Sequence, residues 1–484
     1  MKAQNKSRSR TTLQFNEQKL SITLVRNMYL CCHYNASDLS ILTDFDKYKS
    51  NLNIVAKSFV TLGKPLNFNS TNLYIRDTFL LAPAGSKSLA SIGKLYSNEG
   101  VEKTVISQYD KENMGEFLFR DRKTFEEYAI KDALITLKHS LAMEQFNFTI
   151  KKIGVPITIS SLGRNFVLEH WNEQYEKHFP YQISGDCLMG NSDKTQMPKG
   201  LFATGDVGLH LSYYIGNYKS GRNESIMYGC DNDTLWNDYD LTNAYTTAMT
   251  HLSLPNYNQG SVFEVTKINE LTPTQLLKGY WNFKGSFNFP QDVKYPSIPC
   301  YVDKTTTVYP LRGECLLTGP ELLLARNQKC EFVFKSTYYI PPTEKEIKSG
   351  RLNLKIPVKP FQEIIQEVQS KRREYPKGDF MNMLYKELGN SMYGNIVRGM
   401  SNKKSFDTLS GKMLRMTATE ISNPILASWT TAFMRSVIGE CLHNIKKLGG
   451  KVVSVTTDGF ITNLENLESK LLKLKEEEIP LLLL

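Results

Sequence analysis

The chain has 484 residues, of which 41% are hydrophobic and 22% charged, a balance that excludes a disordered chain and suggests roughly two to four domains. Lysine and arginine exceed aspartate and glutamate by 59 to 49, and this formal charge of +10 favours a polyanionic partner without requiring one. No uncharged apolar run approaches the roughly 18 residues of a membrane span, and the eight cysteines and seven histidines form no CxxC pair or zinc pattern. We therefore expect an intracellular protein with reduced thiols and no membrane partner. Residues 1–12 are basic and contain no acids. This composition is compatible with a transit peptide, and equally with a chain whose true start lies elsewhere.

The first half of the chain is expected to be mixed α/β. Residues 20–145 alternate short apolar runs with helical patterns, with a strand expected at 22–25 and a helix at 124–144. Residues 150–225 are rich in Gly, Asn and Ser, and we expect them to form a strand-like connector.

The second half is expected to contain two strands, near 235–241 and 451–455. A loop-rich stretch (about 255–345) and a helical stretch (about 358–397) should lie between them. The last twenty residues are expected to form a charged helix that stops abruptly.

The segment DYDLTNAY, residues 238–245, places acids at the end of an expected strand. An acid at a strand end followed by a turn can hold a hard cation whose other ligands are phosphate oxygens. The backbone N–H groups of the turn can face a triphosphate. An ordinary strand-end aspartate is the alternative interpretation.

The segment KELGNSMYG, residues 386–394, is expected on a helix. There Lys386, Asn390 and Tyr393 fall on one face, which presents a cation, an amide and an aromatic ring together. A lysine suits the β- and γ-phosphates, and a tyrosine beside a glycine suits stacking beneath a base pair. An amphipathic helix without chemistry is the alternative.

The segment VSVTTDGFIT, residues 453–462, has two short apolar arms around a small turn, which predicts a hairpin with Asp458 at its tip. Asp-Gly is a common turn signal, so this segment alone is weak. Upstream, a basic run at 371–373 interrupts the helical stretch and is either a phosphate-binding cluster or a solvated charged face.

In this order the three segments resemble motifs A (D-x-x-S-L-Y), B (K-x-x-x-N-S-x-Y-G) and C (D-T-D) of protein-primed family B DNA polymerases. Motif B matches at every specified position. Motif A keeps Asp240 and Tyr245 but has Asn243 and Ala244 in place of Ser-Leu. Motif C has Thr456 where the first Asp is usual, and its TTDGF form resembles that of mitochondrial linear-plasmid polymerases.

The resemblance implies a two-metal reaction. Asp240 and Asp458 would hold two Mg²⁺ ions (Mn²⁺ being possible), and Tyr245 would lie against the sugar and exclude a ribose 2′-OH. A basic residue near 371–372 would meet the triphosphate, the choice between the two positions staying open. The residues expected to bind the nucleotide are Tyr245, Lys371, Arg372, Lys386, Asn390 and Tyr393.

Two segments outside these motifs extend the resemblance. YKSGRNE, residues 218–224, resembles the Y-x-G-G linker between exonuclease and polymerase domains, so DNA contacts are expected from Tyr218, Gly221 and Arg222, and also from Gly394. Residues 309–322 resemble the segment that follows motif A in plasmid polymerases.

Residues 33–38 and 128–132 resemble the second and third exonuclease motifs, with Asn35, Asp38, Tyr128 and Asp132 as exonuclease-like residues. In the third motif the tyrosine orients water and the aspartate binds metal. The segment 76–80 also resembles the family, but we expect no chemistry from Asp77. The first exonuclease motif, D-x-E on the opening strand, has no counterpart ahead of residue 38.

The implied fold is mixed α/β: an incomplete ribonuclease H-like exonuclease domain, then a palm and fingers with two protein-primed-type insertions, and a thumb that is largely missing. We thus expect a chain truncated at both ends. The expected divisions are 1–150 (exonuclease-like), 151–225 (connector), 226–255 (palm, motif A), 256–357 (terminal-protein-type insertion), 358–397 (fingers, motif B), 398–430 (second insertion) and 431–484 (palm, motif C).

The expected function is template-directed DNA synthesis on a DNA template and primer with deoxynucleoside triphosphates, the first hydroxyl coming from a terminal protein. The expected location is the mitochondrion. A catalytically impaired, DNA-binding remnant of such a polymerase is the first alternative, and a standalone nuclease is the second.

Overall fold

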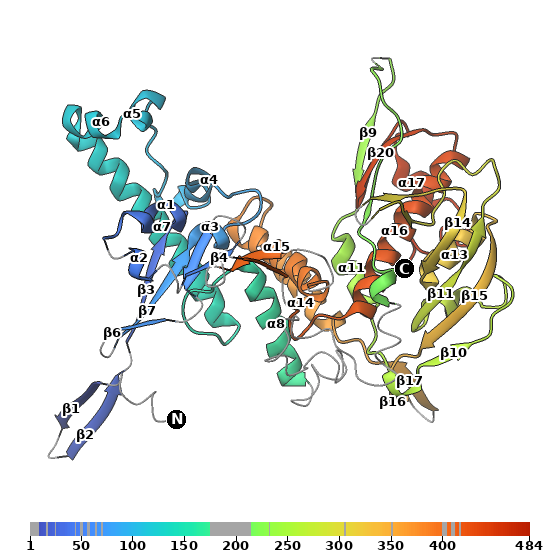
Figure 1. Cartoon of the computed structure of the whole chain (residues 1–484), viewed down its shortest axis with the longest axis horizontal. Coiled ribbons are helices and arrows are strands. Elements are labelled where there is room, and N and C mark those ends of the chain that lie inside the picture. The colour runs from blue at the N-terminus through green and yellow to red at the C-terminus, as the bar shows by residue number, and fades with distance from the viewer. Residues whose placement is uncertain are drawn as a thin grey trace. The chain divides into compact units, whose positions relative to one another are not determined.

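The computed structural model is mixed α/β and divides into two compact units (Figure 1). Unit 1 comprises Met1–Glu169, Val368–Met392 and Asn402–Met416, and unit 2 comprises His170–Glu367, Tyr393–Ser401 and Thr417–Leu484. The residues that the structure describes are 9–15, 18–24, 26–43, 45–48, 52–55, 59–62, 65–68, 71–174, 214–231, 233–303, 306–349, 352–398, 404–407, 412–415 and 418–484.

Unit 1 is built on a small sheet in which β3 (Arg26–Cys32) pairs in parallel with β7 (Thr71–Asp77), and β6 (Leu66–Phe68) adds an antiparallel edge. Apolar side chains from the connection between the parallel strands, Leu39, Leu52 and Leu62, pack with Ile75 of β7 into one core. This burial holds the crossover connection against the sheet, as a parallel pair requires.

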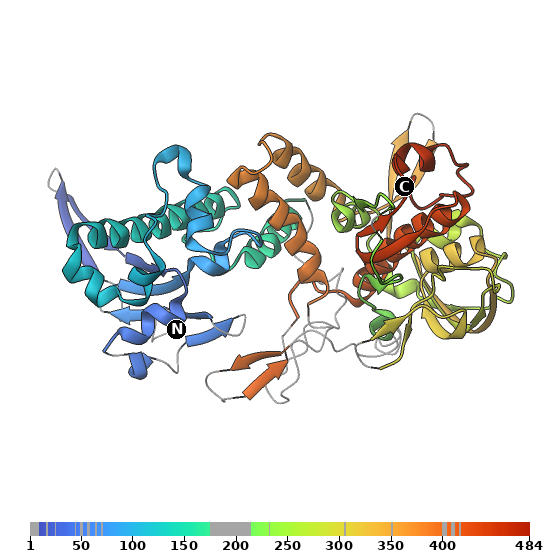
Figure 2. The same ribbon diagram turned by 90° about the horizontal axis from the view of Figure 1, so that it is seen from above.

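The long helix α7 (Arg122–Thr149) confirms the helix expected over 124–144 and lies beside the β3–β7 pair (Figure 2). It begins where the Asp121 side chain accepts a hydrogen bond from Thr124 N (3.1 Å). Its buried face carries Ile135, His139 and Met143 at a spacing of four. Burial lowers the pKa of His139 to about 4, so this histidine is a neutral core residue that bonds Tyr96 Oη (3.0 Å).

Helix α8 (Ile159–Gln174) corrects the expectation of a strand-like connector over this part of 150–225. Ile159, Leu162 and Phe166 recur at helical spacing and are buried, which is the pattern of a helix packed on one face. A side chain at Gly163 would meet Ser391 Oγ of α15 at 1.9 Å, so the glycine permits a close approach of the two helices. Residues 175–213 of the connector lie outside the described residues.

The helical stretch expected at 358–397 is confirmed as α14 (Gln362–Arg373) and α15 (Phe380–Ile396). The break between them contains Pro376 and Gly378, the latter with φ of 91°. Helices α8, α14 and α15 each contain a boundary between the two units.

Unit 2 contains an antiparallel palm sheet of order β8 (Arg222–Ser225), β20 (Val452–Thr457), β21 (Gly459–Thr462) and β9 (Asn237–Asp240). The two strands expected near 235–241 and 451–455 are thereby confirmed as β9 and β20. Val452, Val455 and Phe460 pack against Ile438 and Leu442 of helix α16 (Pro424–Lys447), which forms the core under the sheet.

Helix α16 is buried along nearly its whole length. Asn423 caps it by accepting hydrogen bonds from Ile425 N (2.9 Å) and Leu426 N (3.0 Å), and Pro424 occupies the first turn, where no donor is lost. Its neighbours are α11 (Ala244–Thr250) and α13 (Gly319–Asn327).

The loop-rich stretch expected at about 255–345 is wrong, because these residues form a second sheet. Its order is β10 (Ser261–Phe263), β15 (Glu331–Ile340), β11 (Tyr280–Asn288) and β14 (Arg312–Leu317), with α12 (Pro273–Leu277) and α13 in the connections. Cross-strand aromatic pairs hold it, such as Trp281 stacked on Tyr339 with ring centroids 4.1 Å apart.

The charged helix expected over the last twenty residues is also wrong, since only α17 (Leu467–Leu472) is helical there and the remainder forms turns. Ile479 and Leu481 are buried, so this end of the chain packs into unit 2 by apolar contacts. No helix among the described residues combines the length and apolarity of a membrane span.

The remaining elements are β1 (Ser9–Phe15), β2 (Gln18–Leu24), α1 (Asn35–Asp38), α2 (Phe45–Tyr48), β4 (Leu52–Val55), β5 (Phe59–Leu62), α3 (Thr78–Leu81), α4 (Leu89–Lys94), α5 (Gln108–Glu112), α6 (Met114–Arg120), β12 (Cys300–Tyr301), β13 (Thr307–Val308), β16 (Glu344–Ser349), β17 (Leu352–Pro357), β18 (Lys404–Asp407) and β19 (Lys412–Arg415). The strand expected at 22–25 is confirmed as far as Leu24 by β2.

Candidate active site

The structure brings Asp240 and Asp458 together in unit 2. Asp240 ends β9 opposite Gly459, and Leu241 N donates a hydrogen bond to the Asp458 carbonyl oxygen (2.9 Å). The Asp240 carboxylate lies over the hairpin, because a Cβ built on Gly459 would sit 3.3 Å from its Oδ1. Asp240 is exposed and Asp458 partly buried, so both carboxylates belong to the rim of the palm sheet.

The hairpin tip that carries Asp458 is strained. Thr457 has φ of 58°, and Asp458 N donates to Thr456 O at 2.6 Å, the i→i+2 bond of a γ-turn. A β-branched residue with positive φ is an outlier that persists only where its surroundings fix it. Thr457 Oγ1 donates to Asn223 Oδ1 (3.2 Å) of the neighbouring strand β8, which provides such a fixed point.

Strand β9 alternates its side chains as a half-buried strand should. Asp238 and Asp240 are exposed, and Tyr239 between them turns inward. The Tyr239 ring packs 6.0 Å from Phe460, and its hydroxyl donates to Leu464 O (2.9 Å). The inward tyrosine thus fixes which face the two acids occupy.

Three tyrosines form a cluster beside the hairpin tip. Tyr245 lies on α11, which starts after Asn243 in the left-handed conformation (φ 55°). Its ring lies 4.4 Å from that of Tyr393, at 32°, and Tyr393 is hydrogen-bonded to Tyr218. Burial raises the pKa of both Tyr245 and Tyr393, so the hydroxyls stay neutral at physiological pH.

Gly221 closes this cluster from the linker side. A Cβ there would lie 2.6 Å from Thr457 Cγ2 and 2.8 Å from the Tyr245 hydroxyl. The linker backbone at Gly221 therefore lies close to both Tyr245 and Thr457. A side chain at position 221 would force one of these two side chains to move.

Arg222 differs from the expectation of a DNA contact, because its guanidinium is turned inward and only 1% exposed. It donates to Glu224 (2.6 and 2.8 Å) and to Pro296 O (3.0 Å), and it lies 4.0 Å over the Tyr309 ring. These contacts make Arg222 a support of the linker.

Helix α15 carries motif B, and two of the three residues expected on its polar face, Lys386 and Asn390, are exposed, whereas Tyr393 is partly buried in the tyrosine cluster. Lys386, Asn390 and Gly394 are exposed along one side, while Leu388 and Met392 on the other side are fully buried. Lys386 and Asn390 belong to unit 1, and Tyr393 belongs to unit 2.

Lys371 and Arg372 have different surroundings in α14. Lys371 is exposed and pairs with Glu374 (3.0 Å), an ion pair of the kind that is worth little in water. Arg372 is partly buried, and Asn382 of α15 accepts from its Nε (3.5 Å) and donates to its carbonyl oxygen (3.0 Å).

The second exonuclease-like segment is organised by Asp77, which sequence reasoning had left without a role. Its buried carboxylate accepts hydrogen bonds from the backbone N–H groups of Tyr34 (2.9 Å), Asn35 (2.9 Å) and Phe79 (3.0 Å). Asn35 is buried and Asp38 exposed. Burial and the neighbouring Asp77 charge raise the pKa of Asp38.

The third exonuclease-like segment contains a residue that sequence reasoning missed. Lys103 Nζ donates to Asp132 Oδ2 (2.7 Å) and lies 4.8 Å from the centre of the Tyr128 ring. No spacing links Lys103 to this helix in the sequence, since it precedes α7 by a loop and two short helices. The Asp132 charge is thus balanced by a lysine within unit 1.

Comparison with known proteins finds DNA polymerases that are similar to this chain. No family model matches. The chain is 31% identical over 412 residues to the primer-independent DNA polymerase PolB of Escherichia coli, covering 81% of this chain and 44% of that protein. The chain therefore spans less than half the length of this relative.

Solved structures show the same fold. Phi29 DNA polymerase with primer-template DNA and incoming nucleotide matches 90% of this chain and 71% of its own, with a TM-score of 0.55 and 13% identity. Phi29 DNA polymerase with single-stranded DNA matches 95% and 80%, with a TM-score of 0.55 and 11% identity. These comparisons confirm the expected fold and the expected resemblance to family B DNA polymerases of the protein-primed type.

Proposed function

We propose that this chain, a relative of the family B DNA polymerases in sequence and in fold, carries the nucleotidyl-transfer site of a template-directed DNA polymerase. The observation that carries the proposal is the juxtaposition of Asp240 with the hairpin tip that holds Asp458. Two aspartates from different segments thus lie on neighbouring parts of the palm sheet beside a cluster of tyrosines, as nucleotide transfer would require.

The two carboxylates fit Mg²⁺, with Mn²⁺ as an alternative. Mg²⁺ is usually held by one or two carboxylates together with substrate phosphates, and no cage of three or more His, Cys, Asp or Glu residues occurs in the part of the chain that the structure describes. Bound metal would activate the attacking hydroxyl and stabilise the departing pyrophosphate. In this proposal Asp240 and Asp458 hold the metals between them, at the rim of the sheet.

The nucleotide would meet residues from motifs A and B. Tyr245 would place its ring against the sugar and exclude a 2′-OH, and the Tyr393 ring, 4.4 Å away and tilted by 32°, would support it. Lys386 and Asn390 would contact the triphosphate and the base. Of the two candidates in α14, we favour Lys371, because its exposed ion pair can be exchanged for a phosphate whereas Arg372 is bound to Asn382.

The DNA would run along the linker and the motif B face. Tyr218 and Gly221 border the tyrosine cluster, and Gly394 leaves an open surface on α15 where a side chain would meet nothing within 4 Å. Arg222 would act from inside by supporting the linker.

Priming is a separate part of the proposal. A terminal protein would supply the first hydroxyl, gripped by the insertion at 256–357, while the second insertion at 398–430 would encircle DNA. The relative that is described as primer-independent favours a second candidate, synthesis that starts without a primer. Omitting the primer, with and without added terminal protein, separates the two.

The domain boundaries at 1–150, 151–225, 226–255, 256–357, 358–397, 398–430 and 431–484 stay predictions, and so does the mitochondrial location.

A primer-extension assay in Mg²⁺ tests the proposal. Templated extension that disappears in Asp458→Asn is expected. DNA binding without extension would favour the impaired remnant instead, and shortening of a 3′-labelled strand without extension would favour the nuclease.

A further inference from the structure

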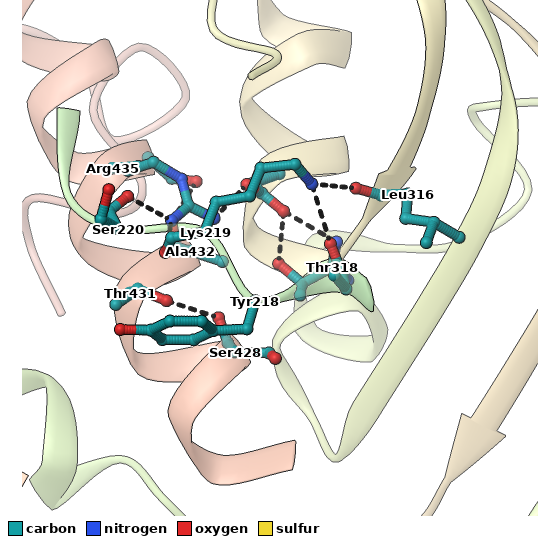
Figure 3. Close-up of polar contacts among 12 residues, drawn as sticks. Tyr218, Lys219, Ser220, Leu316, Thr318, Ser428, Thr431, Ala432 and Arg435 are labelled. Carbon is teal, nitrogen blue, oxygen red and sulfur yellow. Dashed lines mark hydrogen bonds and ion pairs between the residues drawn. The ribbon is translucent and has the colours of Figure 1, made fainter. Parts of the chain in front are cut away.

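Three charged side chains are buried together beneath the linker (Figure 3). Lys219 comes from the linker, Glu321 from α13 and Arg435 from α16, and none of them is more than 4% exposed. Burying charge is costly unless each group is paired and hydrogen-bonded, so such a group needs a structural reason.

Arg435 connects the helices to the linker backbone. Its Nη1 donates to Lys219 O (2.5 Å) and Ser220 O (2.8 Å), and its Nη2 donates to Glu321 Oε1 (2.7 Å). Lys219 Nζ donates to Leu316 O (3.1 Å), which ties the linker to β14 as well.

Glu321 holds Arg435 in this position. Its other oxygen, Oε2, accepts from Thr318 N (2.9 Å) and Thr318 Oγ1 (3.1 Å) at the start of α13, which fixes the carboxylate. Burial opposes its ionisation, but the Arg435 and Lys219 charges outweigh burial and lower the pKa of Glu321. The carboxylate is therefore charged and orients the guanidinium.

The carbonyl groups that Arg435 binds directly precede the residue that touches the candidate active site. Gly221 follows Ser220, and a Cβ built on it would lie 2.8 Å from the Tyr245 hydroxyl and 2.6 Å from Thr457 Cγ2. Tyr218, on the other side of Lys219, is hydrogen-bonded to Tyr393. A displacement of the two carbonyls would thus move both borders of the tyrosine cluster.

We propose that Glu321 is a positioning residue that, through Arg435, sets the place of the linker residues 218–221 and with it the fit of the nucleotide sugar against Tyr245. This inference rests on the proposed polymerase function. It gives a role to the segment 309–322, whose resemblance to the family the nucleotide-binding residues leave unexplained.

A matched pair of variants tests it. Glu321→Gln removes the charge that orients Arg435, and Gln328→Met, directly after the same helix, removes a buried hydrogen bond to Tyr295 O (2.9 Å) without touching the linker. We expect Glu321→Gln to lower kcat/KM for a deoxynucleotide on a DNA primer by about 10- to 100-fold and to weaken discrimination against ribonucleotides, because small misplacements at a reacting centre have effects of that size. Gln328→Met should leave both quantities unchanged.

A second measurement does not depend on catalysis. Deuterium uptake of backbone amides in residues 217–224 should rise in Glu321→Gln and stay at the wild-type level in Gln328→Met. Unchanged uptake in Glu321→Gln would overturn the inference even if the chain is active. If the wild-type chain transfers no nucleotide, the proposed function fails, and the uptake result still decides whether Glu321 positions the linker.

A double variant separates an effect on catalysis from an effect on folding. Glu321→Met with Arg435→Met replaces the ion pair by apolar side chains, a change that buried pairs often tolerate. We expect it to restore the unfolding midpoint but not kcat/KM. Restoration of both would show that Glu321 acts on stability alone, and the inference would be wrong.

Discussion

Single side chains carry the chemistry that we propose. Substituting Asp240 and Asp458 is the most direct test of it. Replacing either by Asn should lower primer extension by more than about 100-fold, since even groups that only support a metal ligand cost 10- to 100-fold. DNA affinity, measured by a mobility shift, should change little. Asp238→Asn is the control, because Asp238 is exposed on the same face of β9 but does not lie opposite the hairpin tip. Equal losses in all three variants would contradict the assignment.

The Tyr245 ring gives a second prediction at this scale. Tyr245→Val should raise ribonucleotide incorporation, because the ring that would block the 2′-OH is lost. Tyr245→Phe should keep discrimination, since the ring remains and only the hydroxyl beside Gly221 is removed. Steady-state insertion of matched ribo- and deoxynucleotides measures both. Discrimination that survives in the valine variant would rule out a sugar gate.

The sequence predicted those site residues that belong to short motifs. Asp240, Tyr245 and Asp458 were expected from two short segments, 238–245 and 453–462, and the structure brings them into one unit. Lys103 and Arg435 were not expected, because each acts through a partner far away in the chain: Asp132 for the first, Glu321 and the linker carbonyls for the second. A single sequence, considered without an alignment of related sequences, contains no sign of such pairs.

Among the elements, the β20–β21 hairpin allows a test of its strained tip. Thr457 has φ of 58°, a conformation that costs an ordinary side chain roughly 1–2 kcal/mol and a β-branched one at least as much. Asn tolerates this conformation better. Thr457→Asn should therefore raise the free energy of unfolding by about 1 kcal/mol, measured by urea denaturation. Thr456→Asn, in the extended strand, should not, and a gain there would argue that the tip is unstrained.

Helix α16 and the turns at the end of the chain give a pH-dependent prediction. Glu440 of α16 is buried and accepts hydrogen bonds from Leu481 N (3.3 Å) and Leu482 N (2.8 Å). Burial raises its pKa from an ordinary 4.5 to about 7. The folded state therefore holds a proton that the unfolded state releases between these two values, and the free energy of unfolding should fall as pH rises from about 4.5 to about 7.

The slope should approach on the order of 1 kcal/mol per pH unit within that window and should be absent in Glu440→Gln. Urea midpoints of both proteins across the window measure it. The same slope in the glutamine variant would assign the effect to other groups.

The elements themselves were predicted unevenly. Helix α7 was expected from a helical pattern over residues 124–144. The sheet of β10, β11, β14 and β15 was missed because its strands pair across long connections and are held by aromatic contacts such as Trp281 with Tyr339, which no local window contains. The sequences T-P-T-Q at 272–275 and T-G-P-E at 318–321 are capping boxes, and they would have indicated α12 and α13.

For the molecule as a whole, we predict that this chain lacks efficient 3′→5′ exonuclease activity. Two-metal hydrolysis needs several free carboxylates. Asp77 is occupied by three backbone N–H groups, and Asp132 is paired with Lys103. Asp38 is then the remaining acid among the exonuclease-like residues.

Degradation of a 3′-labelled single strand in Mg²⁺ or Mn²⁺ tests this prediction, with Asp132→Ala as the control. Digestion at the rate of an active family member that disappears in Asp132→Ala would show that other acids complete the site. Slow digestion that Asp132→Ala leaves unchanged would come from a contaminant and would leave the prediction standing.

The position of β9 at the edge of the palm sheet affects what fraction of the molecules folds with the correct strand register. An edge strand of four residues is held by one neighbour, and its pairing is the easiest in the sheet to shift. A slip of two residues would place Asp238 where Asp240 belongs, opposite Gly459, and leave every acid facing outward. Tyr239, through its bond to Leu464 O, is the group that would oppose this error. A preparation with weakened Tyr239 contacts would then contain an inactive register isomer that is soluble, compact and indistinguishable by circular dichroism. Active-site titration would reveal it, because the number of active sites would be smaller than the number of protein molecules.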